Sequence, residues 1–211
     1  MIRVSQAVLE PRKTPVQARS AASVEAILEA TLQVLLDVGK ERLTTTKVAL
    51  RAGVSVGTLY QYFPNKSSLL QAALKRHLSE VSDEVVSVCR DQAGQSLTQM
   101  ATALITAFLE AKMRNVKTSV ALYSVSSDLD GARIVQQMGV RFNKAVAEML
   151  DTAQEQLTTD PRLVATILQS AMVGVSRRIL ESSSPEKQLE PLQRELIVLA
   201  CAYLEASSIA R

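Results

Sequence analysis

The chain has 211 residues, of which 47% are hydrophobic, so it can bury a sizeable core without help from a metal or a disulfide. Its net charge of +3 is small but uneven: residues 1–66 carry nine basic and five acidic side chains, and residues 67–211 carry 15 and 16. A basic excess at one end suits binding to phosphates. The N-terminus lacks the apolar segment of a signal peptide, and the longest apolar run, residues 196–204, is too short to span a membrane. We therefore expect a cytoplasmic protein with no membrane partner.

Residues 1–19 are expected to form a flexible basic arm. They contain two prolines and the basic residues Arg12, Lys13 and Arg19, and they show no helical periodicity. Such an arm can lie in a DNA minor groove, and a solvated tail is the alternative. From Ser23, a suitable helix cap, apolar residues recur at helical spacing as far as Gly39. The residues predicted to face inward on this helix are Val24, Ile27, Leu28, Thr31, Leu32, Leu35 and Leu36.

Residues 44–70 have the pattern of two short helices joined by a tight turn and followed by a third helix. Thr44 can cap the first of these helices, and Gly53 can end it because glycine adopts a positive φ without steric cost. Ser55 can then cap a second helix that runs from Val56 to Tyr62. This spacing predicts a helix-turn-helix.

The outward face of the predicted second helix suits the major groove of DNA. Leu59 and Phe63 are four residues apart and point inward. The residues left on the outside include no acid and are Val56, Gly57, Thr58, Tyr60, Gln61 and Tyr62. Hydroxyl groups donate to phosphates, glutamine can pair with adenine, and glycine allows close approach. For the two tyrosines, packing at the edge of the core is the alternative.

This segment closely resembles the signature of the TetR family, the tetracycline-repressor-type transcriptional regulators. The matching string is Val48-Ala49-x-x-Ala52-Gly53-Val54-Ser55-x-Gly57-Thr58-Leu59-Tyr60-x-Tyr62-Phe63-x-x-Lys66. The resemblance covers about residues 20–78, and Val48 stands where isoleucine is usual. It implies that Tyr60, Tyr62 and Lys66 contact phosphates. It implies further that the base contacts come from Val56, Gly57, Thr58 and Gln61. The predicted DNA-binding set is completed by Thr44, Thr45 and Ser55.

The rest of the chain is predicted to be helical to its end. One long helix spans residues 65–90, and breaks near residues 94, 115, 128–131, 158–161 and 182–185 define five more, including one at 132–157. We therefore predict an all-α fold: residues 20–80 form a DNA-binding domain that begins with a three-helix bundle, and residues 81–211 form a helical effector-binding and dimerisation domain.

The last two predicted helices, residues 162–181 and 192–204, are apolar over more than one face. A helix of that kind is buried on two sides, and the second side can be another subunit or the core of the same chain. The resemblance implies a homodimer built as a four-helix bundle from the last two helices of each chain. The residues predicted at this interface are Leu168, Val175, Leu196 and Tyr203.

Deformable and aromatic side chains in the second half of the chain can line a small-molecule cavity, although most such residues simply fill cores. The predicted set is Met100, Phe108, Tyr123, Met138, Phe142 and Met172. Arg114, Arg141 and Arg177 are candidates to meet an acidic ligand. The single histidine, His77, is assigned to the surface or a domain boundary, and Cys89 and Cys201 to buried thiols.

We find no motif for catalysis, for a cofactor or for a metal in this sequence. The predicted function is a DNA-binding transcriptional regulator, a repressor that an unidentified small molecule releases from a palindromic operator in double-stranded DNA. The alternative is an all-helical interaction adaptor that binds no operator.

Overall fold

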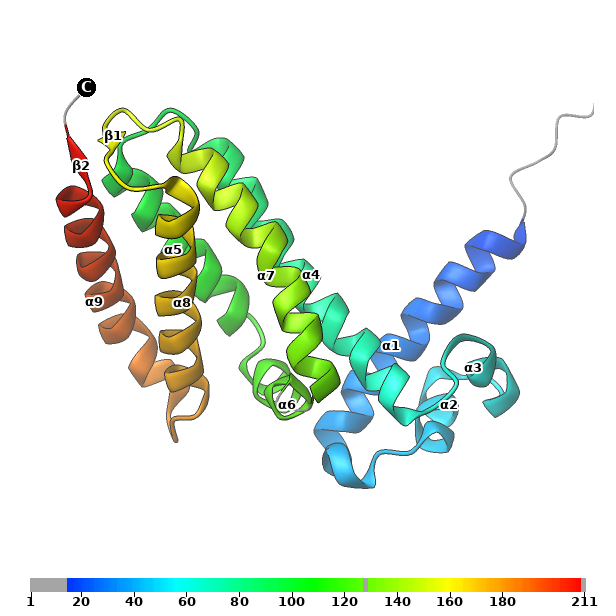
Figure 1. Ribbon diagram of the computed structural model, residues 1–211. Coiled ribbons are helices and arrows are strands. Elements are labelled where there is room, and N and C mark those ends of the chain that lie inside the picture. The colour runs from blue at the N-terminus through cyan, green and yellow to red at the C-terminus, as the bar shows by residue number, and fades with distance from the viewer. Residues whose placement is uncertain (1–14, 127–128, 210–211) are drawn as a thin grey trace, which may run out of the picture. The chain divides into compact units, whose positions relative to one another are not determined.

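The computed structural model describes residues 15–126 and 129–209, which are almost entirely helical (Figure 1). In chain order the helices are α1 (Pro15–Arg42), α2 (Thr45–Ala52), α3 (Val56–Tyr62), α4 (Lys66–Asp91), α5 (Leu97–Met113), α6 (Val116–Ser126), α7 (Leu129–Leu150), α8 (Pro161–Leu180) and α9 (Pro185–Ala206). The chain divides into two compact units, Met1–Leu69 and Leu70–Arg211, so the boundary falls within α4. The predicted all-α class is confirmed.

The first unit is built on α1, which packs against α2. Its core combines Ile27 and Val34 of α1 with Val48 of α2 and Leu59 of α3, all at most 4% exposed. Thr31 is also fully buried, and its hydroxyl donates to the carbonyl of Ile27 at 2.7 Å. The polar side chain thus enters the core with its hydrogen bond satisfied.

Two sequence predictions for α1 need correction. The helix begins at Pro15, so residues 15–19 of the expected flexible arm are helical, while residues 1–14 lie outside the described residues. Proline is favoured in a first helical turn because its missing N–H would be unpaired there, and this start signal outweighed the missing periodicity. Leu36, predicted to face inward, is 42% exposed. The predicted stop at Gly39 is confirmed as an interruption of helical geometry, with φ 75° and ψ 167°.

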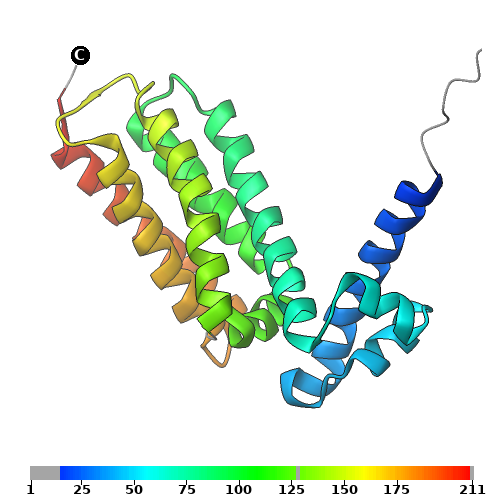
Figure 2. The same ribbon diagram turned by 45° about the vertical axis from the view of Figure 1, so that its right-hand side comes forward.

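The second unit packs α5, α7, α8 and α9 around an apolar core to which α4 also contributes. α5 contacts α8 and α9, while α8 contacts both α7 and α9; Figure 2 shows α7 and α8 side by side. The fully buried centre includes Leu104, Leu109, Val146, Val164 and Met172. Within the described ranges, α8 is the one helix long and apolar enough to cross a membrane, by length and composition alone.

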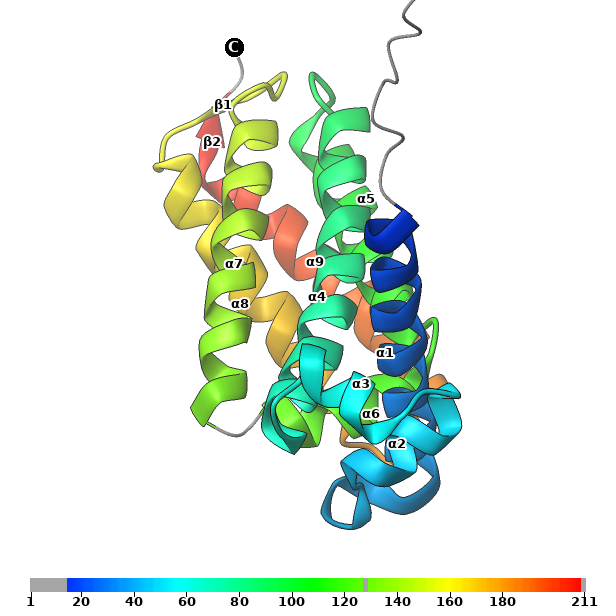
Figure 3. The ribbon, with the colours of Figure 1, turned by 90° about the vertical axis from the view of Figure 1, so that its right-hand side faces the viewer.

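The segment after α7 departs from the predicted helix over residues 132–157. α7 ends at Leu150, and residues 156–157 instead form a short strand, β1 (Gln156–Leu157). This strand pairs antiparallel with β2 (Ser208–Ile209), which follows α9 (Figure 3). The chain is therefore not helical to its end.

Contacts distant in the sequence explain why α7 stops early. Glu155 accepts from the N–H of Leu97 at 2.9 Å, and the hydroxyl of Thr152 accepts from the N–H of Gly94 at 2.9 Å. Thr158 donates through its backbone N–H to the carbonyl of Ser207 at 2.8 Å. Residues 152–158 thus satisfy one N-terminal donor of α5 and one donor of the loop before it, and they bond to Ser207 directly after α9. A continued helix would make none of these bonds.

Candidate functional site

The turn between α2 and α3 has the geometry that the sequence predicts. Thr44 caps α2 by accepting from the N–H of Lys47, and Ser55 caps α3 by accepting from the N–H of Thr58. Between them Gly53 is left-handed, with φ 69° and ψ 27°, and Val54 donates to the carbonyl of Ala49 at 3.0 Å. This closed helix end fixes the direction in which α3 leaves the turn.

α3 buries one side and exposes the other. Leu59 is 0% exposed and Phe63 8%, whereas Tyr60 is 48% exposed. Gly57 and Gln61 are also exposed. The remaining members of the predicted contact face, Val56, Thr58 and Tyr62, are half-buried. For Tyr60 the exposed position rules out a purely packing role, while Tyr62 combines packing with partial exposure.

Packing within the first unit does not require a glycine at position 57. A Cβ built there meets only the hydroxyl oxygen of Ser55, at 3.7 Å, which is ordinary van der Waals contact. The unit itself would therefore accept a larger residue. A glycine at the exposed start of α3 instead lets another surface approach the backbone closely.

Two pairs of hydroxyl groups border this face. Thr45 and Tyr60 join the start of α2 to α3 through an oxygen–oxygen contact of 3.0 Å, and Ser55 and Thr58 form a similar contact of 2.8 Å. Each contact uses one of the two hydroxyl protons in its pair. The other proton remains available to donate outward, as a phosphate oxygen requires.

Two lysines of the first unit stand at the C-terminal end of α1. Lys66 donates to the carbonyl of Glu41 at 3.1 Å, and Lys47 donates to the carbonyl of Arg42 at 3.0 Å. A cation is favourable at the negative end of a helix dipole. An ammonium group has three donors, so each lysine is held in place and keeps donors for an anion.

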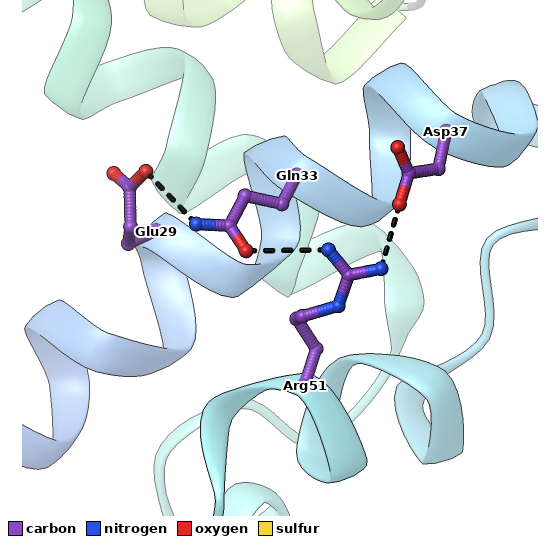
Figure 4. Close-up of polar contacts among 4 residues, drawn as sticks. All are labelled: Glu29, Gln33, Asp37 and Arg51. Atoms are coloured by element: carbon purple, nitrogen blue, oxygen red, sulfur yellow. Dashed lines mark hydrogen bonds and ion pairs between the residues drawn. The ribbon is translucent and has the colours of Figure 1, made fainter.

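Arg51 of α2 is occupied by contacts within the first unit. Its guanidinium pairs with Asp37 at 2.7 Å and donates to Gln33 at 3.4 Å, and Gln33 donates to Glu29 at 3.4 Å (Figure 4). Exposed pairs of this type add at most about 1 kcal/mol of stability. The network orients α2 against α1 and leaves Arg51 poorly placed to serve as a free phosphate contact.

The second unit contains a cavity of about 230 Å³ lined by α4, α5, α6, α7 and α8. Four of the six predicted cavity residues line it: Phe108, Tyr123, Met138 and Phe142. The rings of Phe108 and Phe142 meet edge to face, with centroids 5.9 Å apart. Aliphatic side chains such as Leu74, Leu78 and Val81 also line the cavity.

Met100 and Met172, which the sequence analysis predicted at the cavity, do not line it. Both are 0% exposed and belong to the core of the second unit. A buried methionine and a cavity methionine share the same helical spacing, so periodicity cannot separate them. Of the three candidate arginines only Arg177 reaches the cavity, while Arg141 pairs with Asp83 at 2.7 Å and Arg114 with Glu84 at 3.4 Å.

The cavity also has a polar region formed by His77, Ser82, Lys112 and Ser119. The hydroxyl of Ser119 donates to the carbonyl of Lys112 at 2.7 Å and contacts Nε2 of His77 at 3.2 Å. Since its single proton goes to the carbonyl, Ser119 must accept from His77, which places the imidazole proton on Nε2. Burial, with the positive charges of Lys112 and Arg76, lowers the pKa of His77 to about 4, so the ring is neutral at pH 7.

The exposed apolar side chains of α8 and α9 are not the ones predicted for the dimer interface. Leu168 is 2% and Leu196 4% exposed within the subunit, and Val175 and Tyr203 pack against the same core. The exposed large apolar residues of the two helices are instead Leu163, Ile167, Val173, Val198 and Leu199, which are 44% to 58% exposed, and of these Val173 lines the cavity. The predicted residues lie on the inner face of each helix, which the chain fills itself.

Comparison with known proteins bears on both units. The family described as "Bacterial regulatory proteins, tetR family" matches residues 27–73, and the family described as "Tetracyclin repressor-like, C-terminal domain" matches residues 96–204, more than half of the chain. The chain belongs to the TetR family. It is a DNA-binding transcriptional regulator, and this family is a class of transcriptional regulators rather than of enzymes.

Individual TetR-family members share limited sequence with it. The transcriptional regulator BetI 1 of Chromohalobacter salexigens is 31% identical over 55% of this chain, and the match spans 58% of BetI 1. The transcriptional repressor KstR of Rhodococcus jostii is 28% identical over 78% of this chain and 77% of its own length. A crystal structure of a TetR-family regulator from Mesorhizobium loti superposes with a TM-score of 0.71 at 20% identity, covering 90% of this chain and 99% of that one. The fold of the whole chain is thus that of a TetR-family protein.

Sequence reasoning missed the polar region of the cavity. Lys112 was not singled out, and His77 was assigned to the surface or a domain boundary, because the four residues come from three different helices. One signal was present: Lys112 follows Leu104 and Phe108 at intervals of four, on a face that is otherwise apolar. A charged residue in line with a buried stripe marks either a paired ion or a binding site.

The lowered pKa of His77 predicts a specific loss of stability in acid. Between pH 6.5 and about 4 the unfolded chain binds a proton at His77 that the folded chain does not, so the free energy of unfolding falls as the pH falls through this window. The loss should be about 2–3 kcal/mol and should be absent in His77→Gln. Urea titrations at pH 6.5 and 4.5 measure it. Because the sequence has one histidine, equal losses in both proteins would contradict the buried, neutral ring.

Proposed function

We propose that the chain is a homodimeric repressor that binds a palindromic operator through α3 and is released when a small effector occupies the cavity of the second unit. The observation that carries the DNA-binding part is the exposed side of α3, where glycine, glutamine and tyrosine lie together without an acid and hydroxyl pairs border them. A cytoplasmic location follows from this role.

In this proposal the contact face divides by chemistry. Val56, Gly57, Thr58 and Gln61 meet base edges, since methyl, hydroxyl and amide groups can read the major groove. Phosphate contacts come from the residues that border them, namely Thr44, Thr45, Ser55, Tyr60, Tyr62 and Lys66. Two copies of α3 related by a two-fold axis require half-sites with the same symmetry, so the operator should be a pseudo-palindrome.

The dimer would form through the outer faces of α8 and α9. Leu163, Ile167, Val198 and Leu199 supply an apolar surface on two helices that contact each other. Large exposed apolar side chains gathered on neighbouring elements are typical of a protein–protein interface.

The effector would act by linkage. If occupation of the cavity weakens operator affinity tenfold, a coupling of about 1.4 kcal/mol, the operator must weaken effector affinity by the same factor. This reciprocity holds whatever structural change carries it.

A pair of substitutions tests the proposed DNA interface. Lys66→Ala should weaken binding to all sequences alike and reduce the slope of log K against log salt by about one, because one phosphate contact is lost. Gln61→Ala should instead leave the slope unchanged and relax specificity at one base pair per half-site, at a cost of about 1–3 kcal/mol. Fluorescence anisotropy with the DNA upstream of the gene, at several salt concentrations, measures both.

Lys144→Ala is the matched control, since Lys144 is an exposed lysine of the second unit. It should change neither slope nor specificity. If the wild-type chain showed no preference for any operator fragment over random DNA, the adaptor alternative would replace the regulator.

A further inference from the structure

The cavity of the second unit contains a lysine without a counter-charge among the described side chains, which are those of residues 20–126 and 131–209. Lys112 lines the cavity, and its ammonium makes no hydrogen bond or ion pair with any of these side chains. Burial of the ammonium lowers the pKa of Lys112. Among the described side chains that line the cavity there is no aspartate or glutamate. An ammonium in such a place is costly unless a ligand supplies the negative charge.

A second polar group at the cavity also lacks a partner. The hydroxyl of Ser82 is buried, its residue being 4% exposed, and it forms no hydrogen bond with the described residues. Ser82 lines the same cavity as Lys112. A buried hydroxyl without a partner is unusual in a folded protein and points to a ligand that accepts its proton.

The other hydroxyl and charged groups of the cavity already have partners; Ser126 and Ser176 donate to backbone carbonyls, and Gln169 donates to the carbonyl of Gly139 at 3.4 Å. His77 is neutral and its Nε2 proton goes to Ser119, while Ser119 donates to the backbone. Arg177 stands over the ring of Tyr123, at 5.4 Å, and bonds to Glu181 at 2.9 Å. The site therefore offers one unbalanced positive charge and one free hydroxyl donor. A dianionic phosphate would leave one negative charge unbalanced beside this single cation, whereas a carboxylate would match its charge and accept from the hydroxyl.

We propose that the effector is a small apolar monocarboxylic acid whose carboxylate pairs with the ammonium of Lys112 and accepts from the hydroxyl of Ser82. This inference rests on the proposed function, which makes the cavity the effector site. The body of the acid would lie against the aliphatic and aromatic wall formed by Leu74, Leu78, Val81, Phe108, Leu122 and Phe142. A cavity of about 230 Å³ suits a compact body of one or two rings.

Pairs of acids and their primary amides test the ligand class, because each pair differs in charge but hardly in shape. The probes are 1-naphthoate, 4-phenylbutyrate and cyclohexanecarboxylate, each titrated beside its amide by calorimetry into the full-length protein. At least one acid should bind more than tenfold tighter than its amide. In Lys112→Met, affinity for that acid should fall about 10- to 100-fold while affinity for the amide stays, since a charge-assisted hydrogen bond is lost.

Two further variants separate a binding role of Lys112 from a structural one. Lys112→Arg should restore the preference for the acid, and Arg177→Met, which removes the paired arginine at the same cavity, should leave it unchanged. Lys112→Met should unfold at no lower temperature than the wild type, because it removes an unpaired buried charge. A preference for the acid that survives Lys112→Met would contradict the assignment, as would amides that bind as well as acids or an acid panel that does not bind at millimolar concentration.

Release of operator DNA is measured separately by anisotropy, so the two proposals can fail independently. A neutral compound that binds and releases the operator would overturn the ligand class and keep the proposed function. An acid that binds through Lys112 without changing operator affinity would support the ligand class and overturn the effector role of the cavity.

Discussion

Replacing Leu199 by aspartate should raise the dissociation constant of the dimer by about a hundredfold or more. Leu199 is 56% exposed on α9, beside Val198 at 58%, so the substitution leaves the core of the subunit intact. In the proposed dimer it would place an unpaired carboxylate in a desolvated interface, at a cost of several kcal/mol. Each 1.4 kcal/mol raises the dissociation constant by about a factor of ten. Operator affinity should fall in parallel, because a monomer presents a single recognition helix. Sedimentation velocity and anisotropy measure the two effects.

The matched control is Val140→Asp on α7. Val140 is 69% exposed, so its replacement also puts a carboxylate on an apolar surface position, but on a helix outside the proposed interface. It should remain dimeric with unchanged operator affinity. A dimeric Leu199→Asp protein that binds DNA normally would remove α9 from the interface.

Replacing Leu59 by alanine should destabilise the first unit by about 2–5 kcal/mol and abolish operator binding at 37 °C. Leu59 is 0% exposed at the centre of α3, so its truncation leaves a cavity in the core of the first unit. A unit of fewer than 70 residues has little stability to spare, so this loss is a large part of the total. Thermal unfolding followed by circular dichroism, together with limited proteolysis, should show the first unit opening while the second stays folded.

The helix-turn-helix supplies its own control for that experiment. Leu50 of α2 is 84% exposed, so Leu50→Ala should change the free energy of unfolding by no more than about 0.5 kcal/mol. The same substitution at two leucines nine residues apart thus separates burial from residue type. Equal effects at both positions would show that Leu59 is not a core residue.

The parts of the fold that the sequence predicted well are those set by local chemistry. Thr44, Gly53 and Ser55 define the ends of α2 and α3 through contacts within a few residues, and the structure shows each of them in its predicted role. The end of α7 was not predicted, because it depends on bonds from Glu155 and Thr152 to residues about 60 positions away. No periodicity within residues 132–157 contains that information.

The same distinction applies to the functional sites. Helical spacing correctly marked α8 and α9 as apolar on two sides, but it could not tell whether Leu168 or Leu163 faces outward, since that depends on where α7 and α9 pack. For the cavity, helical spacing predicted both Met172 and Phe142 as lining residues. The packed structure shows that Phe142 lines the cavity and that Met172 is buried in the core. A charged residue in line with an apolar stripe, such as Lys112, would have indicated the cavity better than helical spacing did, but the sequence analysis did not use it.

The open space at Gly57 bears on how regulators of this kind diverge after gene duplication. A Cβ added there meets nothing closer than 3.7 Å within the protein, so alanine should leave folding unaffected and, in the proposed interface, act on the bound DNA. One copy of a duplicated gene can therefore explore new operator sequences at this position, while the other keeps the original target. If Gly57 contacts bases as proposed, a protein engineer who wants an orthogonal repressor can begin at this residue, because a Cβ there meets no close contact within the protein.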